Sequence, residues 1–251
     1  MKLTTTDAAE MNTVNALVVG ASGIGKTTSL RTLPKDQTLI AASERSLLPL
    51  KGLGFDVAKI DCWDDVRGMV SDLRSSLKVG DKTIKILAID SLSDIAELCI
   101  KQIVHTDRRK MIGERTKGKS EVPIGVYEEA MTIEDWGAYG RRLSAFISAV
   151  VQLPVHVVFT CLERWKEDKS TGVTMLVPAM SGALAFACPK YFDIVVNMRN
   201  MKADEEAEER VWQTYNDGRI LAKDSTGKLD KFEATDWTEL FKKVLNGKAK
   251  K

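Results

Sequence analysis

The sequence has little of what marks a membrane or secreted protein. No apolar run approaches the roughly 20 residues that a membrane helix needs, and the first residues, MKLTTTDAAEMN, lack the apolar stretch of a secretory signal. The four cysteines are scattered with no CxxC pair, so neither a zinc site nor a disulfide framework is indicated. We therefore expect a soluble protein of the reducing cytoplasm with no membrane partner.

What remains is the composition of an ordinary globular protein. The chain has 251 residues, of which 44% are hydrophobic and 29% charged, and its net charge is +2. This length suits one large α/β domain with a buried core. We expect a single domain over 1–251, with its core at about 14–200, a C-terminal hairpin and helix at 210–246 and a lysine-rich tail at 247–251.

Short runs of β-branched residues alternate with segments of helical spacing along most of the chain. This alternation is typical of a parallel sheet with helices on both faces. We expect strands at 16–20, 38–43, 56–60, 84–90, 155–161 and 193–198. Helices are expected at 26–33, 63–77, 93–105, 134–153 and 236–245, and hairpins at 162–178 and 210–224, around the turns DKSTG and NDG. The predicted fold class is α/β, a mostly parallel sheet flanked by helices, with C-terminal β-hairpins.

Residues 20–27, GASGIGKT, fit the pattern G-x-x-x-x-G-K-[ST], with a buried strand before them and a helix after. The glycines let backbone N–H groups turn inward and form a nest for phosphate oxygens. Lys26 can then reach the β- and γ-phosphates, and the Thr27 hydroxyl can ligate Mg²⁺. The alternative is a glycine-rich turn that only connects the strand to the helix. We predict that a nucleoside triphosphate contacts the loop, at Gly20, Ala21, Ser22, Gly23, Ile24, Gly25, Lys26, Thr27 and Thr28.

A carboxylate suited to a metal ion follows a second apolar strand. IKILAID ends in Asp90, which places this carboxylate at the carboxyl edge of the sheet, where ligands bind in such folds. We expect Asp90 to ligate Mg²⁺ together with Thr27. The alternative is that Asp90 caps the helix that begins near Ser93.

Other motifs bear on the class of nucleotide-binding protein. A GTPase would add an N-K-x-D motif, which is absent, and a nucleoside kinase would add an arginine-rich lid, for which 107–119 could serve. TLIAASERSLLPL ends a strand and presents Glu44, AIDSLSD follows Asp90 with a serine, and HVVFTCLER contains Thr160 in a further core strand. In these features the chain resembles the RecA-like ATPases. The resemblance implies a RecA-like P-loop core that binds ATP and Mg²⁺, in which Glu44 activates water and Thr160 senses the γ-phosphate.

Further marks resemble a group of phage RecA-like ATP-binding proteins that includes the Sak-type single-strand annealing proteins. They are DWG at 135–137, LPVHVVFT at 153–160 and AKD at 222–224, and with the loop they span most of 16–227. The resemblance implies an ATP hydrolase that acts on single-stranded DNA in phage recombination or annealing, in the host cytoplasm. It also implies self-association into a ring or filament, and a single-strand-binding protein as a further partner.

The chain departs from the RecA-like pattern in two places. Cys161 stands where RecA has a glutamine, and Ser225 stands where RadA-type proteins have the arginine of a Lys-Asn-Arg motif. By the resemblance, Lys223 is the candidate for a charge donated to the γ-phosphate of a neighbouring subunit. Each of these roles has a structural alternative: an edge-strand lysine for Lys223, a solvated surface charge for Glu44 and a half-buried strand residue for Thr160.

Two basic segments could contact nucleic acid. The first has six cations around one acidic residue, Glu114, and suits phosphate contacts that ignore sequence; they are Arg108, Arg109, Lys110, Arg115, Lys117 and Lys119. The second is the hairpin at 163–178, where Arg164, Trp165 and Lys166 combine charge with an aromatic stacking platform. Three functions remain open: an ATPase or annealing protein on single-stranded DNA, a small-molecule phosphotransferase with a lid at 107–119, and a nucleotide-binding scaffold with little turnover.

Overall fold

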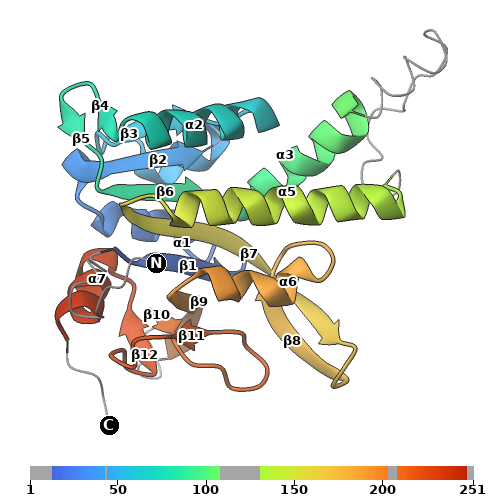
Figure 1. Cartoon of the computed structure of the whole chain (residues 1–251). Coiled ribbons are helices and arrows are strands. Elements are labelled where there is room, and N and C mark those ends of the chain that lie inside the picture. Colours follow the sequence, from blue (N-terminus) through green and yellow to red (C-terminus); the bar gives the residue numbers. More distant parts are fainter. Residues whose placement is uncertain (1–12, 43, 108–130, 203–207, 248–251) are drawn as a thin grey trace, which may run out of the picture.

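The computed structural model describes residues 13–42, 44–107, 131–202 and 208–247. Its centre is a ten-stranded sheet in the order β12-β10-β9-β1-β7-β6-β2-β3, in which β8 pairs with β7 and β11 with β9 (Figure 1). The central strands run parallel: β1 (Asn15–Gly20), β2 (Thr38–Ala42), β3 (Asp56–Lys59), β6 (Ile86–Asp90), β7 (His156–Asp168) and β9 (Ile194–Lys202). The others are antiparallel to their neighbours: β8 (Val173–Pro178), β10 (Glu208–Gln213), β11 (Lys223–Asp224) and β12 (Phe232–Ala234). A separate short hairpin joins β4 (Lys78–Val79) to β5 (Lys82–Thr83).

Helices cover both faces of the sheet (Figure 1). One face carries α2 (Trp63–Ser75), α3 (Leu92–Lys101) and α5 (Ile133–Val151), and the other carries α1 (Lys26–Ser29) and α7 (Trp237–Asn246). A short helix, α6 (Leu184–Ala187), lies between β8 and β9 in the chain. No helix in the described ranges is both long and apolar enough to cross a membrane.

The central strands are buried on both faces because successive side chains point to opposite sides of a strand. On β1, Leu17 and Val19 pack in the cluster that includes α2, α3 and α5. Ala16 and Val18 pack in the second cluster, which includes α7. Burial on both sides explains why these strands appear in the sequence as continuous apolar runs. The predicted fold class, a mostly parallel sheet flanked by helices, is confirmed.

Two helices are shorter or less regular than predicted. The segment predicted as a helix at 26–33 is α1 followed by a 3-10 turn, η1 (Leu30–Thr32), before Pro34. The segment predicted at 93–105 is α3 followed by a π-helical stretch, η4 (Gln102–Asp107). The hairpin predicted at 162–178 is confirmed, since β7 and β8 pair antiparallel from Glu163↔Pro178 to Asp168↔Val173.

The hairpin predicted at 210–224 is wrong. β10 and β11 pair with β9 and not with each other: Glu208–Gln213 lie along Asn197–Lys202, and Lys223–Asp224 lie along Ile194–Val195. The NDG turn is present, because the Asp217 carboxylate accepts the backbone N–H groups of Arg219 at 2.9 Å and Ile220 at 2.7 Å. It directs the chain toward β8, where the Leu176 N–H donates to the Arg219 carbonyl at 2.6 Å.

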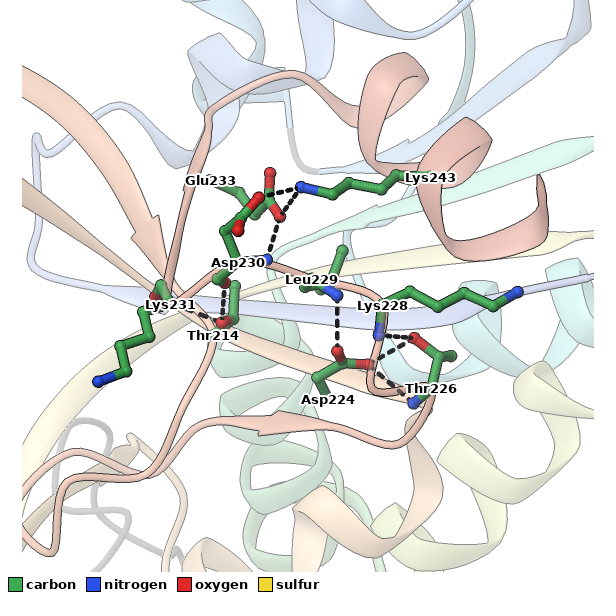
Figure 2. Close-up of polar contacts among 9 residues, drawn as sticks. All are labelled: Thr214, Asp224, Thr226, Lys228, Leu229, Asp230, Lys231, Glu233 and Lys243. Atoms are coloured by element: carbon green, nitrogen blue, oxygen red, sulfur yellow. Dashed lines mark hydrogen bonds and ion pairs between the residues drawn. The ribbon is translucent and has the colours of Figure 1, made fainter. Parts of the chain in front are cut away.

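The segment between β11 and α7 is held by hydrogen bonds and ion pairs (Figure 2). The Asp224 carboxylate accepts the backbone N–H groups of Thr226 at 2.8 Å and Leu229 at 2.9 Å, and the Thr226 hydroxyl at 2.6 Å. On α7, Lys243 forms ion pairs with Asp230 and Glu233, each at 2.5 Å. Asp236 caps α7 as predicted, accepting from the Glu239 N–H at 3.0 Å.

Candidate nucleotide site

The glycine loop joins the carboxyl end of β1 to the start of α1. Gly23 and Gly25 have φ values of 76° and 112°, in the left-handed region that favours glycine. Gly25 is the N-cap residue of α1, and because it has no side chain it does not cap the first backbone N–H groups of the helix. These N–H groups are therefore available to an anion.

Lys26 folds back over the loop. Its ammonium donates to the carbonyls of Gly20 at 2.8 Å and Ala21 at 2.7 Å, and the residue is 9% exposed. Burial lowers the pKa of the Lys26 ammonium below its usual value, while the carboxylates of Asp90 and Glu163 oppose that shift. A buried ammonium whose direct partners are two neutral carbonyls can exchange them for the oxygens of a charged anion such as phosphate.

Asp90, at the end of β6, lies between two threonines. The Thr27 hydroxyl donates to its Oδ2 at 2.9 Å, and the Thr160 hydroxyl on β7 donates to its Oδ1. Asp90 is 4% exposed, and Thr160 is fully buried. Burial raises the pKa of the Asp90 carboxyl above its usual value, and the two hydrogen bonds oppose the shift.

The oxygens of Thr27 and Asp90 fit a Mg²⁺ ion. Adjacent corners of an octahedron with bonds of about 2.1 Å are about 3 Å apart, and Thr27 Oγ1 lies 2.9 Å from Asp90 Oδ2. Mg²⁺ also commonly takes one or two protein oxygens and leaves its other positions to phosphate and water.

The alternative role of Asp90 as a helix cap is wrong. The N-cap residue of α3 is Ser91, whose hydroxyl accepts the Asp94 N–H at 3.3 Å. The Asp94 carboxylate in turn accepts the Ser91 N–H at 3.2 Å, which completes a capping box. Asp90 is therefore not used by the helix that follows it.

The backbone of Glu44 lies next to this site, and its side chain falls outside the described residues. Ala42, the last residue of β2, pairs with Asp90, and Glu44 begins the 3-10 segment η3 (Glu44–Leu50) two residues later. A cavity of about 200 Å³ opens at the same edge of the sheet, lined by Ala42, Asp61 and Asp90 among others.

Sequence reasoning missed two groups beside the loop. Glu163 follows the core part of β7 directly, and its carboxylate accepts the Asn197 amide of β9 at 3.0 Å. Arg210, on β10, places its Nη1 2.9 Å from the position that a Cβ would occupy on Gly25. Glu163 directly follows an apolar strand, and this position could have indicated a site residue at the carboxyl edge of the sheet. Nothing in the sequence around Arg210 indicates that it lies beside the loop.

Lys223 lies away from the loop of its own chain. It pairs with Val195 near the start of β9, and its ammonium donates to the carbonyl of Phe192 at 2.7 Å. The loop follows Gly20, at the opposite end of the parallel strands. Within one chain, Lys223 therefore cannot reach a nucleotide held by this loop.

The residues predicted to contact nucleic acid are only partly described. Arg108, Arg109, Lys110, Arg115, Lys117 and Lys119 lie outside the described residues. On β7, Trp165 is 62% exposed, and strand alternation places it on the face opposite to Arg164 and Lys166. The Lys166 ammonium donates to the Gly182 carbonyl and lies 5.6 Å from the centre of the Phe186 ring, so it contacts the body of the protein.

The fold and the site together define a P-loop nucleotide-binding protein: a glycine loop after a buried strand, a lysine folded over it, and a buried aspartate beside its threonine. The comparison with protein families agrees. The family model described as "AAA domain" matches residues 12–226, so the chain belongs to this family. The protein is accordingly a P-loop ATPase.

The individual proteins that resemble this chain have low sequence identity to it. No curated protein matches the chain. Among solved structures, it is similar to the flagellar accessory protein FlaH from Methanocaldococcus jannaschii, with 9% identity and a TM-score of 0.39 over 87% of this chain and 83% of that one. It is also similar to an ATPase of the type III secretion system of pathogenic bacteria, with 12% identity and a TM-score of 0.40 over 74% of this chain and 52% of that chain, about half its length.

Proposed function

We propose that this protein hydrolyses ATP in response to single-stranded DNA, as expected from its resemblance to the phage RecA-like ATPases that include the Sak-type annealing proteins. The observation that supports the proposal is the course of β7. This 13-residue strand contains Thr160, which contacts Asp90, and continues outward to the exposed Trp165. One rigid element therefore connects the candidate metal ligand to a candidate DNA-contacting side chain.

The site supplies what ATP hydrolysis requires. Thr27 and Asp90 would hold Mg²⁺, which would neutralise charge on the phosphates. Lys26 would exchange its two backbone carbonyl partners for the β- and γ-phosphates. Glu44, next to the strand of Asp90, is the proposed base that orients and deprotonates water.

A change at Asp90 could reach the outer hairpin through few contacts. Thr160 and Cys161 are adjacent and fully buried. The Cys161 thiol lies 3.3 Å from the Ser93 hydroxyl at the start of α3, and the Leu162 N–H donates to the same hydroxyl at 2.9 Å. The segment of β7 between the site and the hairpin is thus held to the start of α3, which suits the transmission of a small shift.

Trp165 is the proposed stacking platform. Every base has an aromatic face, so an exposed tryptophan binds single strands with little sequence preference, at about 1–3 kcal/mol per stacked base. Arg164 and the basic segment at 108–119 would supply contacts to the phosphate backbone. Self-association on DNA, and a single-strand-binding protein as a partner, belong to the same proposal.

Binding of a fluorescent oligothymidylate, measured by anisotropy with and without ATP and Mg²⁺, tests the proposal. Wild-type protein should bind more tightly with ATP, and its affinity should fall as salt is raised. Trp165→Ala should weaken binding by about 5- to 150-fold. Leu48→Ala is the matched control, because Leu48 is an apolar residue of 76% exposure outside the hairpin.

The outcomes separate the three functions. Salt-sensitive binding that depends on Trp165, with hydrolysis accelerated by DNA, supports the proposal. Hydrolysis that needs a nucleoside acceptor would identify a phosphotransferase instead, and ATP binding without turnover would identify a scaffold. Absence of salt-sensitive DNA binding by the wild-type protein contradicts the proposal.

A further inference from the structure

The side chain of Arg210 lies across the phosphate loop of its own chain. From the position that a Cβ would occupy on Gly25, its Nη1 is at 2.9 Å, its Cζ at 3.4 Å and its Cδ at 3.5 Å. The outer half of the side chain therefore runs along the loop beside the glycine that precedes Lys26. Two features favour glycine at position 25. Its φ of 112° is one that other residues rarely adopt, and a Cβ there would lie only 2.9 Å from the arginine Nη1.

The strand register explains this position. On β9, Asn197 pairs with Val19 of β1, and the strand continues past the end of β1. Arg210 pairs with Asn200, three residues farther on, which is about 10 Å at 3.3 Å per residue. The β9–β10 pair thus extends beyond the carboxyl edge of the parallel strands, on the side where the glycine loop begins.

β10 is anchored so that Arg210 faces the loop. Trp212, two residues along and on the same face, is fully buried, and its ring centroid lies 4.3 Å from that of Trp237 on α7. Trp237 in turn donates from its indole N–H to the Ser29 hydroxyl of α1 at 3.1 Å. The strand that carries Arg210 and the helix that follows the loop are therefore parts of one packed unit.

Arg210 has no carboxylate partner among the described residues, and it is exposed. A guanidinium is always charged, and its fixed planar donors suit phosphate oxygens. Here the charge lies beside an anion nest that already contains Lys26. Two cations at one site repel each other, and a bound polyphosphate removes that repulsion.

From this geometry we propose that Arg210 binds the phosphates of the nucleotide held by the loop of its own chain. The inference rests on nucleotide binding by the loop and not on the proposed response to DNA. Gly25 lies next to Lys26, in the part of such loops whose N–H groups cradle the α- and β-phosphates. We therefore assign Arg210 to these phosphates, which ATP and ADP share.

The test measures the affinities for ATP and ADP, in the absence of DNA, by isothermal titration calorimetry. Arg210→Gln should weaken both affinities by a similar factor, about tenfold to hundredfold, the range for a hydrogen bond to a charged group. Arg210→Lys keeps the charge and loses the planar fork, so its nucleotide affinities should lie between those of the wild-type protein and Arg210→Gln. Lys26→Ala is the positive control, and it should bind neither nucleotide measurably.

Arg199→Gln is the matched control. It removes one positive charge from the same pair of strands, but Arg199 pairs with Val211 and faces away from the loop, where it donates to the Gln213 amide oxygen at 2.6 Å. Loss of affinity in Arg210→Gln but not in Arg199→Gln supports the proposal. Equal affinities in the two variants overturn it, as does a loss for ATP alone. Unchanged thermal denaturation without nucleotide shows that Arg210→Gln is folded.

Discussion

Asp90 and Asp224 are both partly or fully removed from water, yet the same substitution should change stability in opposite directions. Asp90 accepts two threonine hydroxyls, whereas Asp224 accepts two backbone N–H groups and one hydroxyl. A hydroxyl can rotate and accept a hydrogen bond, but a backbone N–H can only donate. Asparagine has the shape of aspartate with one donor in place of an acceptor, so it fits the first environment and not the second.

The magnitudes follow from these partners. In Asp90→Asn, the amide can donate to one threonine and accept from the other, and a buried charge is removed, so we expect a gain of about 1 kcal/mol, typical of relieving a functional site. In Asp224→Asn, one backbone N–H is left facing an NH₂ group, at a cost of about 1–3 kcal/mol. For a chain of this size, each kcal/mol corresponds to about 2–4 °C in Tm.

The dependence on pH should also differ between the two variants. Burial raises the folded pKa of Asp90, so the native protein binds that proton more tightly than the unfolded chain, and wild-type stability falls as pH rises from 3.8 through the raised pKa. The advantage of Asp90→Asn should thus be full at pH 7 and vanish toward pH 3.8. Burial raises the pKa of Asp224, but its hydrogen bonds outweigh burial and lower the pKa below its usual value. The contribution of the Asp224 carboxylate to stability is therefore present above pH 3.8 and is lost as pH falls through the lowered pKa.

Denaturation followed by circular dichroism from pH 7 to below pH 3.8 measures both effects. Phosphate release below both Tm values gives the functional counterpart. In Asp90→Asn, Mg²⁺-dependent hydrolysis should fall by more than about 10- to 100-fold, the loss typical when a residue that only supports a metal ligand is changed. Asp224→Asn should retain this hydrolysis. If Asp90→Asn lowers Tm at pH 7 as much as Asp224→Asn does, the Asp90 carboxylate stabilises the fold and the reasoning is refuted.

Two other variants test the predicted catalytic groups. Glu44→Gln should keep its ATP affinity and lose roughly 10²-fold or more in turnover, the usual value of a general base; unchanged turnover would direct attention to Glu163. Lys223→Ala should bind ATP but lose hydrolysis stimulated by DNA, and mixing it with Lys26→Ala should partly restore activity if subunits share sites. No recovery, with a monomer by light scattering under ATP and DNA, would contradict the role of Lys223 in a neighbouring subunit.

The parts of this site that could be predicted from the sequence are those set by contiguous residues. The loop at 20–27 lies between a strand and a helix that adjoin it in the chain, and Asp90 ends an apolar strand whose carboxyl edge is fixed by its direction. The same local logic found the β7–β8 hairpin, because its two strands are joined by a short turn of four residues, 169–172, that pairs them directly.

The parts that could not be predicted depend on strand register between distant segments. The NDG turn has the chemistry of a hairpin turn, and it does form around Asp217. What decides the pairing is the open edge of β9, nine residues long, which takes β10 along one part and β11 along another. No periodicity within 210–224 reports the length of a strand that ends eight residues earlier, at Lys202.

This register also separates two cations that look equivalent in the sequence. Arg210 and Lys223 both follow the last parallel strand, but β10 pairs with the carboxyl half of β9 and β11 with its amino end. Because the phosphate loop lies at the carboxyl edge, Arg210 contacts the loop of its own chain, and Lys223, bonded to the Phe192 carbonyl, lies at the other edge. A cation at that edge can serve only a site in another subunit, so the two substitutions should separate binding within one chain from activity that needs an assembly.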